Sequence, residues 1–187
     1  MAATDYFYKK KPMMKSFSGG VLRLLFPALL TTAGLLTTAC KKDSEATTTP
    51  AKDYSATDDA IIQTYLTTNT ITTAQKQPSG LYYVPVVNNT AGVSATAGKT
   101  VVVLYTGRLM DGTVFDASSS HGNVPFSFVL GQGRVIAGWD EGIALMRKGE
   151  KGVLLIPSGM GYGASGSGSA IPPNSVLRFE VELVNVL

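Results

Sequence analysis

Apolar and polar residues alternate most clearly near the end of the chain. Every second position there carries an apolar side chain: Leu177, Phe179, Val181 and Leu183. The positions between them are charged: Arg178, Glu180 and Glu182. A period of two with one apolar side is typical of an antiparallel strand that buries one face. The pattern therefore predicts a strand over residues 176–186.

Shorter runs with the same period predict earlier strands after the turn-forming Pro78-Ser79-Gly80. They span residues 81–87, 100–110, 126–130 and 152–156. Between the last two, residues 139–148 place Trp139, Ile143 and Met146 on one helical face, and Gly149 is expected to end that helix. Many strands with one inserted helix predict the α+β class, as a curved antiparallel β-sheet of five to six strands wrapped on one short α-helix.

A separate short helix is predicted before this sheet. Thr57 suits an N-cap, and Asp58 and Asp59 place acidic charge in the first turn. The apolar residues that follow share one helical face: Ile61, Ile62, Tyr65 and Leu66. The pattern predicts an amphipathic helix over about residues 58–68, within a helical segment at 57–76. A helix of about three turns is short for holding two chains together, so we expect a monomer.

The residues before this helix are poor in bulky apolar side chains. Threonine, alanine and lysine dominate residues 45–56, together with one proline. Such a composition cannot bury enough apolar surface to offset the cost of ordering the chain. Residues 40–56 are therefore predicted to be a flexible tether.

Residues 1–39 have the features of an export signal. Basic residues come first: Lys9, Lys10, Lys11 and Lys15. An apolar run over 21–39 follows, interrupted by Arg23 and Pro27. The part after Arg23, 24–39, is short for a membrane span of about 20 residues and contains the proline, which favours a cleaved signal over a permanent transmembrane helix. A start at Met13 or Met14 would give this leader more usual proportions.

Cys40 is the only cysteine of the chain, so no internal disulfide framework is possible. Leu35-Leu36-Thr37-Thr38-Ala39-Cys40 resembles the lipobox of bacterial lipoproteins, in which the cysteine is lipidated and becomes the new N-terminus. Thr37 departs from that pattern, since leucine is usual three residues before the cysteine. We expect a lipid anchor on Cys40 and a membrane surface in the cell envelope, periplasmic or outer-membrane in a Gram-negative cell.

The formal charge of +3 over 187 residues belongs to the leader. From Cys40 onward the chain carries eleven basic and twelve acidic side chains. No phosphate-binding surface is indicated for that part, and we expect no nucleic-acid partner.

The common catalytic sets are absent from the sequence. His121 is the only histidine, and it lies in a Ser- and Gly-rich stretch without a nucleophile elbow, which indicates a solvated loop residue. Gly161-Tyr162-Gly163-Ala164-Ser165-Gly166 matches the dinucleotide fingerprint, but no helix opens after it. One histidine also argues against a zinc or non-haem iron site, so no metal and no cofactor are expected.

Aromatic residues beside turns are the remaining signal, although each taken alone is as well explained by core packing. As a set they fall within eight short motifs: Val102-Val103-Leu104-Tyr105-Thr106-Gly107, Asp111-Gly112-Thr113-Val114-Phe115-Asp116, Pro125-Phe126-Ser127-Phe128, Leu130-Gly131, Val135-Ile136-Ala137-Gly138-Trp139-Asp140-Glu141-Gly142, Ile156-Pro157-Ser158, Tyr162-Gly163 and Ile171-Pro172-Pro173-Asn174. In order and spacing these motifs resemble the FKBP family of peptidyl-prolyl isomerases, over residues 77–187.

The resemblance implies an isomerase domain with an aromatic pocket for X-Pro bonds. The catalytic residues it implies are Tyr105, Phe115, Asp116, Trp139, Tyr162 and Phe179. The substrate-binding residues it implies are Phe126, Val135, Ile136 and Ile171. Trp139 would form the floor under the proline ring, while the Ile136 N–H and the Tyr162 hydroxyl would donate hydrogen bonds to ligand carbonyls. For Asp116 a turn-capping role is the alternative.

The resemblance also implies the partners: X-Pro-containing unfolded or exported polypeptides, and a macrolide of the rapamycin type. A proline-recognising chaperone or binding module with little turnover would use the same pocket, and so remains an alternative. A third alternative is a structural envelope lipoprotein whose aromatics are core. The loop over 165–170 lacks the larger side chains that many family members place near Ile171, so we expect an open wall there.

Overall fold

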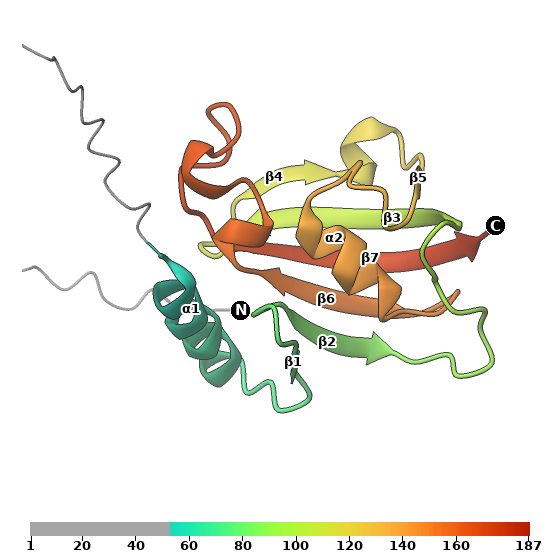
Figure 1. Ribbon diagram of the computed structural model, residues 1–187, viewed down its shortest axis with the longest axis horizontal. Coiled ribbons are helices and arrows are strands. Elements are labelled where there is room, and N and C mark those ends of the chain that lie inside the picture. Colours follow the sequence, from blue (N-terminus) through green and yellow to red (C-terminus); the bar gives the residue numbers. More distant parts are fainter. Residues whose placement is uncertain (1–52) are drawn as a thin grey trace, which may run out of the picture. The chain divides into compact units, whose positions relative to one another are not determined.

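The computed structural model describes residues 53–187 (Figure 1). The predicted leader and Cys40 lie outside this part of the chain, as does most of the predicted tether. The elements follow in the order α1 (Ser55–Thr68), β1 (Gln75–Lys76), β2 (Tyr82–Val87), β3 (Thr100–Leu109), β4 (Val114–Ala117), η1 (Ser118–His121), β5 (Phe126–Val129), α2 (Ala137–Ala144), β6 (Lys151–Ile156), η2 (Ser158–Met160), η3 (Gly163–Ser165) and β7 (Leu177–Val186). The three η elements are short 3₁₀ helices.

The strands form one antiparallel sheet in the order β1-β2-β6-β7-β3-β4. β5 also pairs with β3, beside the half of that strand that β4 leaves open. β3 and β7 form the centre, paired from Val101 opposite Val186 to Leu109 opposite Leu177. The α+β fold with a curved antiparallel sheet is thus confirmed, with seven strands among the described residues.

Two of these strands were missed by the sequence pattern. β1 has two residues, too few for an alternation to show. β4 has four, but its apolar residues Val114 and Phe115 are adjacent, so it has no period of two. The other five strands begin and end within one residue of their predicted bounds, and the pairing of β2 and β3 with their neighbours contains register shifts. Periodicity therefore located the strands that carry most of the core.

Successive side chains of the strands point to opposite faces of the sheet, and each face contributes to a buried cluster. The inner face of the sheet packs on α2, which crosses it in Figure 1, through residues such as Val103, Leu154 and Phe179. Gly138 and Gly142 let this helix approach closely, since an added Cβ would lie 2.4 Å from Ile156 and 2.6 Å from Leu154. A larger residue at either glycine would push the helix away from the sheet.

The prediction of α2 was right about its buried face and wrong about its bounds. Trp139, Ile143 and Met146 are all buried, as their spacing indicated. The helix begins at Ala137 and ends at Ala144. It ends there because the next two N–H groups donate to the carbonyl three residues back and not four, from Leu145 to Gly142 and from Met146 to Ile143. Gly149 does not end the helix; instead its N–H donates to the Leu183 carbonyl.

α1 covers one end of the outer face of the sheet. Ile62 and Leu66 pack against Tyr82, Val84 and Leu155 in a second, smaller core. The helix begins three residues earlier than its pattern indicated. No helix among residues 53–187 combines the length and the hydropathy that crossing a bilayer requires.

A buried carboxylate fastens α1 to the segment after β6. Asp58 is 2 % exposed, and its Oδ2 accepts hydrogen bonds from the Ser158 N–H (2.8 Å) and hydroxyl (2.6 Å). Ser158 opens η2, so Asp58 satisfies a donor that the short helix leaves free. The sequence pattern assigned Asp58 only to the first turn of its own helix.

Candidate functional site

An apolar hollow of about 440 Å³ opens between the inner face of the sheet and the start of α2. All ten residues that the sequence predicted for the pocket line it: Tyr105, Phe115, Asp116, Phe126, Val135, Ile136, Trp139, Tyr162, Ile171 and Phe179. Arg134, Ser167 and Ala170 complete the lining. We call this hollow the aromatic pocket. The structure brings the predicted residues together, and their individual roles remain predictions.

Trp139 is the centre of the aromatic pocket. It is 5 % exposed, and its ring meets Tyr105 and Phe179 edge to face at centroid distances of 5.1 and 5.2 Å. The rings of Phe126 and Phe128 also lie beside the Trp139 ring, at centroid distances of 6.1 and 5.9 Å. Edge-to-face pairs of this kind stabilise one arrangement of the rings beyond simple burial. The floor of the pocket is therefore preformed.

A glycine in β3 leaves space for two of these rings. A Cβ on Gly107 would lie 2.6 Å from the Phe115 ring and 2.7 Å from the Phe179 ring. Phe115 and Phe179 meet edge to face across it, at a centroid distance of 5.4 Å. Any side chain at this position would displace the wall of the aromatic pocket.

The wall predicted to be open is made of small residues. Ser167 and Ala170 are the members of the 165–170 loop that line the pocket. The loop is nevertheless closed on itself, since the Ser167 and Ile171 backbones exchange hydrogen bonds of 2.8 and 3.1 Å. Gly166 has a φ of +63°, and a Cβ there would lie 2.3 Å from the Ile171 carbonyl oxygen. The wall thus lacks bulk but has a defined backbone.

Three donors on lining residues lack partners among the described residues: the buried indole N–H of Trp139, the Ile136 backbone N–H and the Tyr162 hydroxyl. The last two concern a ligand most directly. The backbone N–H of Ile136 makes no hydrogen bond within residues 53–187, because α2 begins at the next residue. The Tyr162 hydroxyl likewise has no partner, and this residue is 38 % exposed. Both groups are free to donate to a ligand carbonyl.

Asp116 is held by three donors. Its Oδ2 accepts from the Tyr105 hydroxyl at 2.6 Å. Its Oδ1 accepts from the Ala117 N–H at 2.8 Å and lies 2.9 Å from His121 Nε2. Partial burial tends to raise the pKa of Asp116, but the bonds from Tyr105, His121 and Ala117 outweigh it and lower that pKa below its usual value. Burial and the adjacent carboxylate in turn raise the pKa of the Tyr105 hydroxyl, so the pair is a carboxylate with a neutral phenol.

His121 is the site residue whose contact the sequence analysis missed. Its side chain is 63 % exposed, as a solvated residue would be, yet it pairs with Asp116. The reason is local, since β4 runs directly into η1 and the turn brings a residue five positions later back to the carboxylate. The five-residue spacing alone carried no signal, because the short 3₁₀ helix was not predicted.

Residues 53–187 contain no group of three His, Cys, Asp or Glu side chains that could hold a metal ion. The lining of the aromatic pocket offers apolar surface, a few hydrogen-bond donors, the Asp116 carboxylate and the Arg134 guanidinium.

Comparisons with known proteins agree with this site. Residues 92–184 match the family described as FKBP-type peptidyl-prolyl cis-trans isomerase. The chain is 53 % identical over 95 residues to an FK506-binding protein of Neisseria meningitidis serogroup C, covering 51 % of this chain and 86 % of that protein. It is 48 % identical over 101 residues to FK506-binding protein 1 of Dictyostelium discoideum, covering 54 % and 94 %.

Solved structures show the same fold. FkpA from Escherichia coli is similar with a TM-score of 0.61 and 38 % identity, covering 71 % of this chain and 60 % of that one. AtFKBP13 is similar with a TM-score of 0.57 and 36 % identity, covering 61 % and 98 %. From its motifs, its pocket and these relatives, the chain belongs to the family of FKBP-type peptidyl-prolyl cis-trans isomerases.

Proposed function

We propose that this protein is a peptidyl-prolyl cis-trans isomerase that assists the folding of exported proteins. The observation that carries the proposal is the preformed aromatic pocket around Trp139, with unpaired donors at Ile136 and Tyr162. Relatives are named peptidyl-prolyl cis-trans isomerase in Drosophila melanogaster and Saccharomyces cerevisiae. Family and geometry thus favour the same reaction.

The reaction requires rotation about a peptide bond, not its cleavage. The barrier is about 18–20 kcal/mol, because the C–N bond loses its resonance when it is twisted. Before proline the trans preference is already weak, so both isomers are present in unfolded chains. A catalyst therefore has to stabilise the twisted amide more than either planar form.

The aromatic pocket suits that task. A twisted amide is less charge-separated than a planar one, so an apolar surround disfavours the planar forms more. The Ile136 N–H and the Tyr162 hydroxyl would hold the carbonyls on either side while the proline ring rests on Trp139. Each tenfold gain in rate requires about 1.4 kcal/mol of such differential stabilisation.

Turnover by the full chain is the direct test. NMR exchange spectroscopy on a short X-Pro peptide measures the interconversion of isomers without a coupling protease, and we expect the chain to accelerate it. Binding of the peptide without acceleration would instead support the alternative of a proline-recognising module.

Macrolide binding provides a second test of the pocket. We propose that a macrolide of the rapamycin type fills it, which is consistent with relatives named FK506-binding protein. Trp139 is the only tryptophan of the chain, so its fluorescence reports on the pocket alone. Unchanged fluorescence at saturating macrolide would favour the third alternative, in which the aromatics are plain core.

The proposed location is the cell envelope, on a lipid attached to Cys40. Its support is the basic and apolar leader, followed by the lipobox-like residues before the cysteine. About a dozen residues then separate Cys40 from the start of the described domain, which would let the domain reach clients near the membrane. Mass spectrometry of the mature N-terminus tests this, and a retained Met1 or an unmodified Cys40 thiol would contradict it.

We further propose that the tethered protein is a monomer. α1 uses its apolar residues Ile62 and Leu66 on its own sheet, which leaves them unable to pair with a second copy. Sedimentation of the detergent-solubilised protein tests this, and a concentration-dependent dimer would contradict it.

A further inference from the structure

His121 lies beside the aromatic pocket without lining it. The nitrogen Nε2 of its ring is 2.9 Å from Asp116 Oδ1, and Asp116 Oδ2 accepts from the Tyr105 hydroxyl at 2.6 Å. Asp116 and Tyr105 both line the pocket, and the Tyr105 ring meets the Trp139 floor. Two hydrogen bonds thus connect an exposed imidazole to Tyr105, and the Tyr105 ring contacts the floor of the site.

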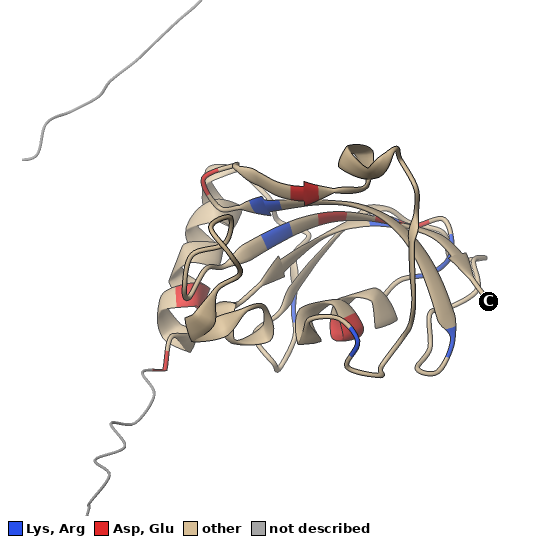
Figure 2. Ribbon diagram, turned by 90° about the horizontal axis from the view of Figure 1, so that it is seen from above, with Lys and Arg blue, Asp and Glu red and all other residues tan. Residues whose placement is uncertain are grey.

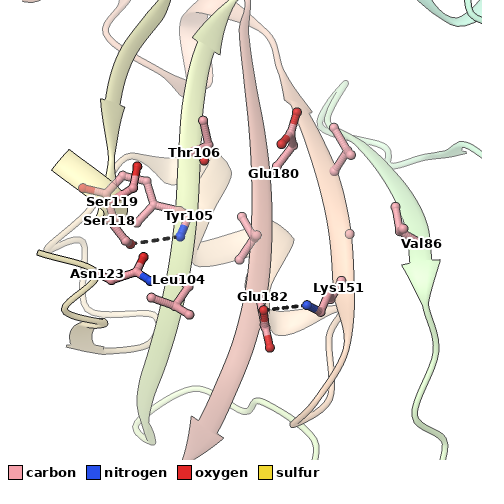
Figure 3. Close-up of a pocket in the computed structure, with 13 residues that line it drawn as sticks. Val86, Leu104, Tyr105, Thr106, Ser118, Ser119, Asn123, Lys151, Glu180 and Glu182 are labelled. Atoms are coloured by element: carbon pink, nitrogen blue, oxygen red, sulfur yellow. Dashed lines mark hydrogen bonds and ion pairs between the residues drawn. The ribbon is translucent and has the colours of Figure 1, made fainter. Parts of the chain in front are cut away.

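The backbone around η1 holds the imidazole in this place. The Tyr105 N–H donates to the Ser118 hydroxyl at 3.1 Å, drawn as a dashed line in Figure 3. At the other end of the short helix, the Asn123 N–H donates to the Ser118 carbonyl at 2.9 Å, across Gly122 with its φ of +71°. β3 therefore fixes both the start of η1 and the Tyr105 ring.

The carboxylate of Asp116 determines which protonation states of His121 can form the hydrogen bond between them. Because Asp116 is ionised at neutral pH and only accepts, the His121 nitrogen that faces it has to carry a proton. Both the neutral tautomer with Nε2–H and the imidazolium meet this condition. The hydrogen bonds that these two forms donate differ in strength, since a bond between two charged groups is shorter and stronger than one from a neutral ring.

We propose that His121 is a positioning residue for the isomerase reaction, which holds the Asp116 carboxylate against the Tyr105 hydroxyl and holds it more firmly when the imidazole is protonated. This inference rests on the proposed function. His121 acts through Asp116, which lines the aromatic pocket, and is not itself a lining residue.

The other titratable or charged groups that line the pocket come from four segments. They are Tyr105 on β3, Asp116 on β4, Arg134 in the loop before α2, and Tyr162 between η2 and η3. Carboxylates, phenols and guanidinium groups ordinarily titrate outside pH 5–8, whereas an imidazole titrates within it. His121 is the only histidine of the chain, so substitution of this residue tests whether a change in turnover over that range depends on it.

The expected size of the effect is modest because the pair is exposed. The side chains of His121 and Asp116 are 63 % and 42 % exposed, so water screens their attraction. We expect kcat/KM of the full chain to fall about two- to fivefold as the pH rises from 5 to 8, on the scale of a partly screened ion pair. The change should lie in kcat and not in KM, because protonation of His121 does not alter the residues on which the proline ring would rest.

Two substitutions separate charge from hydrogen bonding. His121→Gln keeps a neutral donor, so its profile should be flat near the high-pH value of the natural protein. His121→Arg keeps a donor with a permanent charge, so its profile should be flat near the low-pH value. Exchange NMR on an X-Pro peptide gives both profiles, and thermal melts confirm folding. A flat profile in the natural protein, or an unchanged slope in both variants, would overturn the proposal.

A second measurement does not depend on turnover. The Ala117 N–H shares the Oδ1 acceptor with His121, at 2.8 Å, so its ¹⁵N–¹H resonance should titrate with the same midpoint as the imidazole ring. Loss of that titration in His121→Gln supports the contact, and an Ala117 resonance insensitive to the ring refutes it. Absence of turnover in the natural protein would contradict the proposed function instead, leaving this titration to decide on His121.

Discussion

The two faces of the sheet carry hollows of nearly equal size, whose linings differ in the hydrogen-bond donors they leave for a ligand. The aromatic pocket on the inner face measures about 440 Å³, and a groove on the outer face measures about 430 Å³. We call the second the outer-face groove; Figure 3 shows its lining, including Leu104, Thr106, Lys151, Glu180 and Glu182. Volume alone thus does not distinguish a site from a surface depression.

The difference lies in what the lining leaves unsatisfied. In the outer-face groove Glu182 pairs with Lys151 at 2.8 Å, and Glu180 pairs with Arg178 at 3.1 Å. Acidic and basic residues are interspersed along the strands, as Figure 2 shows. In the aromatic pocket, by contrast, the Ile136 N–H and the Tyr162 hydroxyl keep unused donors beside an apolar floor. A ligand carbonyl can use these donors in the aromatic pocket, whereas the charged groups that line the outer-face groove already pair with protein side chains.

Removal of a pocket ring should produce the largest effect. We expect Trp139→Ala or Phe179→Ala to lower kcat/KM by about ten- to a hundredfold, since each tenfold corresponds to about 1.4 kcal/mol of lost stabilisation. Loss of a buried ring also destabilises a domain by about 3–5 kcal/mol, so turnover is measured below the melting transition found by circular dichroism.

Lys151→Ala and Glu182→Ala are the matched controls in the outer-face groove. They break an exposed ion pair, worth about 0–1 kcal/mol, and should leave turnover unchanged. If they reduced turnover as much as the ring substitutions, the distinction between the two hollows would be wrong.

Gly107→Ala should damage the aromatic pocket without removing a ring. The new methyl group would lie 2.6–2.7 Å from the rings of Phe115 and Phe179, which have to move. We expect kcat/KM to fall about three- to tenfold, with destabilisation of about 1–3 kcal/mol from overpacking. Gly159→Ala, where an added Cβ meets nothing within 4 Å, is the control, and equal kinetics in the two variants would show that the ring positions do not matter.

The hydrogen bonds between Asp58 and Ser158, which fasten α1, should contribute to stability and not to turnover. Asp58→Ala leaves the buried Ser158 donors without an acceptor, at a cost of about 1–3 kcal/mol. Urea unfolding measures the loss, with Asp53→Ala as control, because the bond that Asp53 accepts from the Ser55 N–H at the start of α1 is exposed. A tenfold fall in kcat/KM of folded Asp58→Ala protein would mean that α1 also shapes the aromatic pocket.

The sequence predicted the inner face better than its surroundings, for physical reasons. Residues such as Phe179 and Val181 face one core, so their alternation shows in the sequence, and family motifs supplied the pocket residues. The outer layer under α1 was not predicted, because Tyr82 and Val84 are as apolar as their inward neighbours and the pattern of β2 therefore does not show that both of its faces are buried. The His121 contact depends on a short turn whose Ser-rich sequence has no periodicity.

The pH dependence of the free energy of unfolding should also distinguish the two hollows, and we expect this effect to be the smallest. The three donors to Asp116 lower its pKa in the folded protein, despite partial burial that acts to raise it. A lowered folded pKa means that the carboxylate contributes stability above its unfolded pKa of about 3.9, and that this contribution is lost as the pH falls through the folded value. Asp116→Asn should therefore lose stability relative to the natural protein at pH 6 and approach it near pH 2. Urea unfolding across this range measures the difference, with Glu182→Gln in the outer-face groove for comparison. A constant difference for Asp116→Asn would show that its three hydrogen bonds do not favour the ionised carboxylate, and the connection from His121 to Tyr105 would lose its central link.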